Sequence, residues 1–201
     1  MRNIIIRHAT STDDFLEIAK CLYLTDPYIY PTAFGSDIDK ASSAITKLIN
    51  REECLFNYKS IYIATMEGKI CGVLLYNEYG SCWDTDIYYN LIKEYISDKE
   101  RFVYAANNYF IDCSKKPKYG YIDIVALCVL PEYRRMSVSS SLLRTFIEEK
   151  SGSTLTLDVL ADNSTAIHTY KKFGFSITNN YKGFGFTEET RPDCYHMVRE
   201  I

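Results

Sequence analysis

The sequence predicts a mixed α/β fold and places all of residues 1–201 in a single domain. Segments rich in β-branched residues alternate with segments whose apolar residues recur every three or four positions, as strands and helices do. One segment, "YIDIVALCV", is almost continuously apolar, which is typical of a central strand covered on both faces. No repeat or low-complexity linker divides the chain, and its 47% hydrophobic content can fill a substantial core.

The N-terminal half begins with a strand at "NIIIRHAT", after which "STDD" offers side chains that can cap a helix. The apolar residues of that helix lie on one face: Phe15, Ile18, Ala19 and Leu22. "TDPYIYPTAFG" contains two prolines, so we expect a loop there. A second helix follows, with its own apolar face: Ile38, Ala41, Ile45 and Leu48. "SIYIATMEGK" and "KICGVLLYNEYG" meet at a Glu-Gly turn and are expected to form a β-hairpin.

The C-terminal half starts after an insertion at about residues 81–118, which contains a helical pattern in "DTDIYYNLIKEYI". The apolar strand comes next, followed by a helix that starts near Val138 and that Gly152 ends. "TLTLDVLA" is a further strand, and "NSTAIHTYKKFG" is a short helix capped by Asn163 or Ser164. The tail should add two last strands, at "FSITNNYKGFGF" and "CYHMVREI".

Composition argues against several classes of protein. The formal net charge of −3 gives no reason to expect a nucleic-acid partner. The seven cysteines form no Cys-x-x-Cys pair, so we expect reduced, buried thiols and neither a disulfide framework nor a bound metal. The start of the chain lacks the apolar stretch of a signal peptide, and no apolar run approaches the ~18 residues of a membrane span. We therefore expect a cytoplasmic protein with no membrane contact.

The stretch "PEYRRMSVSSSLL" joins the end of the apolar strand to the start of a helix. The first N–H groups of a helix lack partners within it and lie at the positive end of its dipole, so this turn can bind an anion. Arg134 and Arg135 add positive charge beside it, and serines stand where such turns usually have glycine. The alternative is an ordinary helix start with solvated arginines.

Two segments, "LCVLPEYRRMSVS" and "LDVLADNSTAIHTYKKFGF", resemble the GNAT superfamily of N-acetyltransferases. Arg134 stands at the first position of the family's Arg/Gln-x-x-Gly-x-Gly/Ala loop, and Ser137 and Ser139 stand at the positions of its two small residues. The second segment carries the family's pattern as Asn163, Ala166, Tyr170, Gly174 and Phe175. These motifs cover residues 121–175. The resemblance implies a central, mostly antiparallel sheet with splayed middle strands, flanked by helices.

The resemblance also implies that acetyl-coenzyme A is the co-substrate and that no metal takes part. An acetyl group would pass to a primary amine of a small molecule or peptide, by direct attack on the thioester. The loop would bind the pyrophosphate, and the strand and short helix would bind the pantetheine arm. The coenzyme-binding residues implied are Leu127, Cys128, Val129, Arg134, Arg135, Met136, Ser137, Val138, Ser139, Ser140, Asn163, Ala166 and Tyr170. The plainer role of Asn163 is to cap its helix.

Two residues are expected to move protons. Tyr170 is our candidate general acid, because a phenol with a pKa of ~10 is protonated at neutral pH and can donate to a departing thiolate. A packed helix tyrosine is the alternative. Asp123, a lone carboxylate in the apolar strand, is our candidate base, and in the histone-type branch of the family an acidic base stands at this register. It could instead be a strand-entry aspartate in water, and Glu78 and His168 are weaker candidates for the base.

Strand alternation predicts that Asp123 shares a face with Val125, Leu127 and Val129, and that Cys128 points to the opposite face as a core residue.

The acceptor is expected to contact "DPYIYPTAFGSD" and the aromatic residues of the insertion, which could also form a homodimer contact. A non-catalytic acyl-coenzyme A sensor or interaction module on the same fold is the alternative function, and a structural protein that has lost the site is a further one. No Gly-x-Gly-x-x-Gly follows the first strand, which argues against a Rossmann dehydrogenase.

Overall fold

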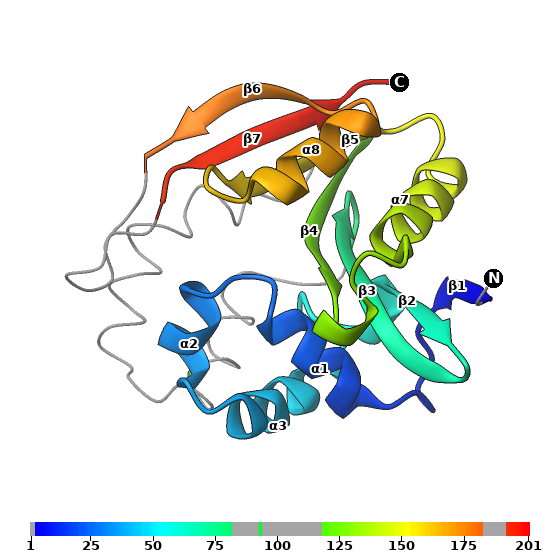
Figure 1. Ribbon diagram of the computed structural model, residues 1–201, viewed down its shortest axis with the longest axis vertical. Helices are drawn as coiled ribbons and strands as arrows, with labels where there is room; N and C mark the ends of the chain where they lie inside the picture. Colours follow the sequence, from blue (N-terminus) through cyan, green and yellow to red (C-terminus); the bar gives the residue numbers. More distant parts are fainter. Residues whose placement is uncertain (1–2, 82–92, 94–117, 183–191) are drawn as a thin grey trace.

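A computed structural model describes residues 3–81, 93, 118–182 and 192–201 (Figure 1). Almost all of the expected insertion, including its helical pattern, therefore lies outside the described residues. Seven strands form one sheet in the order β1-β2-β3-β4-β5-β7-β6. The strands are β1 (Ile4–His8), β2 (Ile61–Met66), β3 (Lys69–Glu78), β4 (Tyr121–Val129), β5 (Thr154–Leu160), β6 (Ser176–Tyr181) and β7 (Cys194–Arg199). Only β4 and β5 are parallel, so the expected mixed, mostly antiparallel sheet is confirmed.

Five α-helices whose bounds lie in the described ranges accompany the sheet. They are α1 (Phe15–Tyr23), α2 (Ile29–Phe34), α3 (Ile38–Ile49), α7 (Val138–Glu149) and α8 (Ser164–Lys172). Asp14 caps α1, because its carboxylate accepts from the N–H groups of Leu16 and Glu17 at 3.0 and 3.2 Å. Short 3₁₀ turns precede β2 and α7, at Tyr58–Ser60 and Pro131–Tyr133.

The prediction of a loop around Pro31 is wrong, because residues 29–34 form the helix α2. Pro31 lies in the first turn of this helix, where the missing N–H would have had no partner within the helix. Asp26 starts the turn by accepting from the N–H groups of Tyr28 and Ile29 at 2.8 and 2.9 Å. Gly35, with φ 87°, ends it. The prolines therefore allow one short helix.

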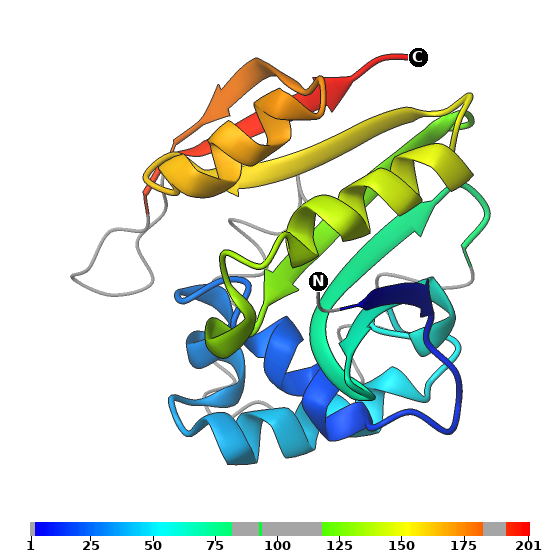
Figure 2. The ribbon, with the colours of Figure 1, turned by 45° about the vertical axis from the view of Figure 1, so that its right-hand side comes forward.

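Two apolar clusters cover the two faces of the sheet. On one face α1, α2 and α3 pack against residues that include Val73, Leu75 and Ala126. On the other face α7 and α8 pack against residues that include Leu74 and Ile124 (Figure 2). Fully burying one large aliphatic or aromatic side chain contributes about 1.5–3 kcal/mol, so these two clusters stabilise the whole sheet and hold its helices in place.

A β-bulge in β4 changes which residues share a face. Leu75 pairs with Ala126 and Tyr76 pairs with Ile124, so Val125 is an extra residue in β4. Asp123 pairs with Asn77 and Cys128 pairs with Val73, and both partners are on the same face of β3.

The expectation that Asp123 shares a face with Leu127 and Val129 is therefore wrong. Asp123 lies on the α1 face of the sheet with Ala126 and Cys128, whereas Leu127 and Val129 pack with the α7 cluster. The expectation that Cys128 points to the face opposite Asp123 is wrong for the same reason, but Cys128 is a buried core residue, as expected.

The two parallel strands diverge, and this opening positions the site. β4 and β5 pair only from Tyr121 with Thr154 to Ile124 with Leu157. β4 then continues to Val129 along β3, while β5 continues to Leu160 along β7. Figure 2 shows the two strands close at one end and apart at the other. The splayed middle strands expected from the sequence are confirmed.

Candidate functional site

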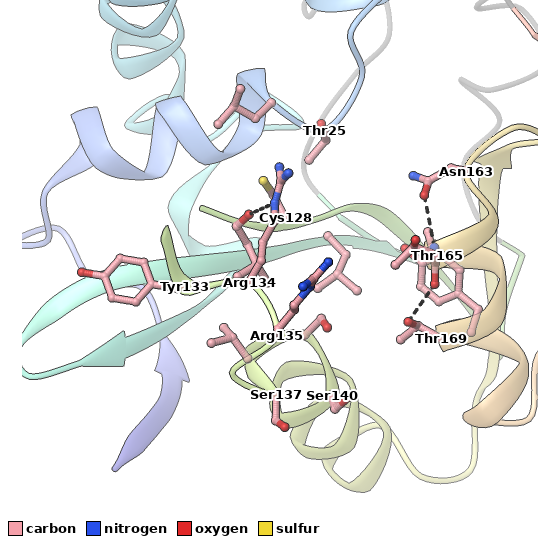
Figure 3. A pocket seen from close by; sticks show the side chains of 17 residues that line it. Thr25, Cys128, Tyr133, Arg134, Arg135, Ser137, Ser140, Asn163, Thr165 and Thr169 are labelled. Atoms are coloured by element: carbon pink, nitrogen blue, oxygen red, sulfur yellow. Dashed lines mark hydrogen bonds between the residues drawn. The ribbon is translucent and has the colours of Figure 1, made fainter. Parts of the chain in front are cut away.

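A pocket of about 690 Å³ lies where β4 and β5 diverge (Figure 3). Its walls are the end of β4, the turn before α7, the first turn of α7 and one face of α8, with the end of α1 at the rim. This volume is in the range of small-molecule and cofactor sites, which favour the gap between diverging elements of a sheet.

The turn before α7 takes a left-handed backbone without any glycine. Arg135 has φ 61°, and Ser137, the residue that precedes α7, has φ 65° and ψ 14°. The Ser137 side chain makes no capping hydrogen bond to the helix. The first N–H groups of α7 thus have no side-chain cap from Ser137, and they remain available to an anion at the positive end of the helix dipole.

Two arginines give this end of the pocket its charge. Arg134 and Arg135 both line the pocket and both are exposed. Arg134 donates from Nε to the carbonyl oxygen of Val129 at 3.4 Å, which holds it beside the end of β4. Neither guanidinium forms an ion pair with a carboxylate among the residues that the structure describes. Both charges are free to meet an anionic ligand such as a phosphate.

The opposite wall is one face of α8. Asn163 is the cap of this helix, because its Oδ1 accepts from the N–H of Ala166 at 3.1 Å, and it also lies at the edge of the pocket (Figure 3). Tyr170 is buried, and its ring packs edge-on against Phe175 at 5.8 Å. Burial, followed by the nearby Cys128, raises the pKa of Tyr170, so its hydroxyl keeps its proton at neutral pH.

Asp123 does not line the pocket. It lies further back on β4, where the hydroxyl of Thr156 donates to its Oδ1 at 2.9 Å. Burial and then repulsion by Asp158 raise its pKa to about 7, against a weaker lowering by Thr156 and His196. A carboxyl group with this pKa accepts and releases protons at neutral pH, which an aspartate in open water does not do.

The weaker candidates for a base occupy other places. Glu78 forms an ion pair with Lys150 at 2.9 Å, beside Tyr76 on the α7 face. His168 is exposed on α8, and His196 is in the last strand.

The structure brings together nearly all of the residues expected to bind a coenzyme. Every one of them lines the pocket except Met136, which is exposed in the turn. The lining also includes residues that sequence reasoning did not identify: Leu24, Thr25, Tyr133, Thr165 and Thr169. Thr165 and Thr169 could have been found, since they share the face of α8 that carries Ala166 and Tyr170. Leu24 and Thr25 follow α1, and no local pattern connects them with the pocket.

Five of the cysteines are described, and all five are buried thiols outside any disulfide: Cys21, Cys54, Cys71, Cys128 and Cys194. Across the described ranges, no three His, Cys, Asp or Glu residues gather in a way that could hold a metal ion. Among the helices that the structure describes, none has the length and apolar character needed to cross a membrane.

Comparison with known sequences gives a family match. The profile of the acetyltransferase (GNAT) family matches residues 29–175. The L-amino acid N-acetyltransferase AaaT of Escherichia coli strain K12 is 30% identical over 93 residues, which are 44% of this chain and 57% of that protein. The aligned part therefore spans little more than half of this relative.

Solved structures share the fold over nearly the whole chain. An N-acetyltransferase from Staphylococcus aureus Mu50 superposes with a TM-score of 0.70 at 20% identity, covering 96% of this chain and 99% of that one. A GNAT family acetyltransferase from Elizabethkingia anophelis with acetyl-CoA bound gives 0.56 at 14% identity, covering 99% of each chain. The match of the family profile to most of the chain, on this splayed sheet, shows that the chain belongs to the acetyltransferase (GNAT) family.

Proposed function

We propose that this protein transfers an acetyl group from acetyl-coenzyme A to a primary amine. The observation that carries the proposal is the pocket between the diverging ends of β4 and β5, which ends on the uncapped start of α7. Arg134 and Arg135 add positive charge where a pyrophosphate would approach the N–H groups of the turn. This turn before α7, here called the serine turn, has serines in place of glycines. It still has the backbone amides, the helix dipole and the cationic side chains that a phosphate needs.

The pantetheine arm would lie along the end of β4. Beyond Ile124 the edge of β4 that faces β5 has no strand partner among the described residues. The backbone groups of Leu127, Cys128 and Val129 on this edge can bond the amides of the arm and polarise the thioester carbonyl. Asn163 keeps its cap hydrogen bond and presents its remaining polar groups at the opposite edge.

The reaction needs two proton transfers. The amine nitrogen attacks the thioester carbon, the C–S bond breaks, and the product is an amide and a thiol. Tyr170 lines the pocket and is protonated at neutral pH, so it has a proton to give to the departing thiolate. Asp123, with its pKa raised to about 7, can take the proton of the amine, and a water must bridge the two because Asp123 does not line the pocket.

The acceptor is proposed as a free amino acid or the N-terminus of a peptide. The relative AaaT is an L-amino acid N-acetyltransferase, and the similar structure of Arabidopsis thaliana Naa50 is a complex with the bisubstrate analogue CoA-Ac-MVNAL. A panel of L-amino acids and short peptides should therefore be incubated with acetyl-coenzyme A while the free thiol is measured.

The test compares the wild type with Tyr170→Phe and with Tyr121→Phe, a tyrosine outside the pocket that is 42% exposed. Tyr170→Phe should lower kcat by roughly 10²-fold or more and still bind acetyl-coenzyme A, since phenylalanine keeps the packing and lacks only the hydroxyl. Tyr121→Phe should change neither. Coenzyme binding without thiol release from any amine would contradict acetyl transfer and favour an acyl-coenzyme A-binding module.

A further inference from the structure

A second pocket, of about 390 Å³, borders the chain that follows β4 and is here called the side pocket. It is bounded by the loop between β1 and α1, the first turn of α1, the turn between β2 and β3, and residues 130–133. Among the described residues, Tyr133 alone lines both the side pocket and the pocket between β4 and β5, here called the coenzyme pocket. Its ring points away from Asn163 and Thr165 on the far wall of the coenzyme pocket (Figure 3). The side pocket is therefore a separate space, whose ligand would not occupy the coenzyme pocket.

Most of the charged side chains around the side pocket already have partners. Arg7 donates to the two carboxylate oxygens of Asp13 at 2.6 and 2.8 Å. Asp14 uses its carboxylate as the cap of α1. Glu17 accepts from Lys20 at 2.9 Å. These groups stabilise the walls of the pocket, and their charges are already compensated by one another or by backbone N–H groups.

Two opposite charges of the side pocket remain unused. Lys69 and Glu132 both line the pocket and are exposed, and neither makes an ion pair or a hydrogen bond with another residue that the structure describes. The N–H of Leu130 donates to the carbonyl oxygen of Cys71 at 3.0 Å, so the chain after β4 runs beside the start of β3. This contact brings Glu132 and Lys69 to one pocket, which offers a ligand one carboxylate and one ammonium.

The side pocket also has an apolar wall. Leu130 is buried, and Ile70 and Tyr133 are partly buried, and all three belong to the cluster that packs under α1. Thr65, the register partner of Ile70, adds a hydroxyl that makes no hydrogen bond within the described part of the chain. A ligand that matches these groups has one positive charge, one negative charge and an apolar side chain.

We propose that the side pocket binds a free amino acid with an apolar side chain. At neutral pH such a molecule carries an α-ammonium group and an α-carboxylate on one carbon atom. The ammonium would donate to Glu132, and the carboxylate would accept from Lys69 and Thr65. Ile70 and Leu130 would contact the side chain, and the volume is in the range of small-molecule sites. A simple cation would be repelled by Lys69 and a simple anion by Glu132, so a zwitterion fits better than either.

The experiment follows one methyl group of the side pocket by NMR, in protein whose isoleucine methyl groups are labelled with ¹³C. Ile70 is suited to this because it lines the side pocket and not the coenzyme pocket, and Ile70→Val assigns its signal. Titration with L-leucine, without acetyl-coenzyme A, should shift the Ile70 signal to saturation and leave the signal of Ile147, which packs under α7, in place. L-Leucinamide lacks the carboxylate and N-acetyl-L-leucine lacks the ammonium, so each should bind roughly tenfold or more weakly.

Two variants test the charges of the pocket itself. Lys69→Met and Glu132→Gln should each raise the Kd for L-leucine roughly tenfold or more, since each removes one charge-assisted hydrogen bond. Lys172→Met and Glu148→Gln are the matched controls, because both residues are exposed and neither lines the side pocket. The controls should bind L-leucine as the wild type does.

The inference goes beyond the proposed reaction, and the two can fail separately. A saturable Ile70 shift that needs both charges, without acetyl transfer to any amine, would uphold the side pocket and refute the proposed reaction. Acetyl transfer without a saturable Ile70 shift up to millimolar L-leucine would overturn the side pocket and leave the reaction standing. The site would also be overturned by a shift that N-acetyl-L-leucine reproduces at equal affinity, or that both charge variants retain.

Discussion

Replacing Ser137 by glycine should stabilise this protein, although a change to glycine usually destabilises a helical region. Ser137 has φ 65°, and its side chain makes no capping hydrogen bond, so the serine loses little when its side chain is removed. The left-handed conformation costs a non-glycine residue about 1–2 kcal/mol, and glycine costs about 0.5–1 kcal/mol in chain entropy. The difference predicts that Ser137→Gly raises the free energy of unfolding by about 0.5–1 kcal/mol.

Urea and thermal unfolding, followed by circular dichroism, can measure this change. For a chain of this length the gain corresponds to a rise in Tm of about 1–4 °C. Arg135→Gly should act in the same direction, since Arg135 has φ 61°. Ser141→Gly is the control, because its N–H bonds to the carbonyl of Ser137 at 2.9 Å within α7, and there glycine should cost a few tenths of a kcal/mol or more. A loss of stability in Ser137→Gly that matches the loss in Ser141→Gly would refute the left-handed turn.

Further predictions concern packing, acid stability and the pH profile. A Cβ at Gly72 would lie 2.8 Å from the carbonyl oxygen of Cys128 and 3.0 Å from Val138 Cγ1. Gly72→Ala should therefore lower stability by about 1–3 kcal/mol and weaken acetyl-coenzyme A binding, and an unchanged urea midpoint would contradict this close contact. Arg7 holds the pKa of Asp13 at about 2, below its ordinary 3.8. The interaction of ionised Asp13 with Arg7 therefore stabilises the folded protein above pH 4, and this stabilisation is lost as the pH falls towards 2. Asp13→Asn should cost about 1 kcal/mol at pH 7, a value reduced for the exposure of Arg7, and only a small part of that at pH 2 in matched urea titrations. Because the pKa of Asp123 is raised to about 7, kcat/KM for the amine should rise with pH through that value, and Asp123→Asn should lower it roughly 10²–10⁴-fold and remove this limb of the profile.

Much of the site follows from local sequence. The turn that begins at Pro131 and the pattern that begins at Asn163 lie in short, contiguous segments, and each segment carries its own strand end and helix start. The structure brings these segments together across the gap between β4 and β5. The resemblance of these two local segments to the GNAT family was therefore enough to name most of the residues that line the pocket.

The features that were missed depend on distant parts of the chain. The bulge at Val125 reverses the alternation of β4, and it is visible only in the register of β4 against β3. The pairing of Asp158 with His196 joins residues that are 38 positions apart. Thr25 reaches the pocket because α1 packs against the sheet, which a single-sequence pattern does not specify.

The central claim is that the pocket beside the serine turn binds acetyl-coenzyme A, and calorimetric titration tests it most directly. Wild type, Ser137→Trp and Ser151→Trp should be titrated with acetyl-coenzyme A, with ATP and desulfo-coenzyme A alongside; Ser151 lies in an exposed turn that does not line the pocket. We predict micromolar binding to the wild type and to Ser151→Trp, and none to a folded Ser137→Trp, whose indole would fill the anion site. No binding to the wild type up to millimolar ligand, or undiminished binding to Ser137→Trp, would contradict the account.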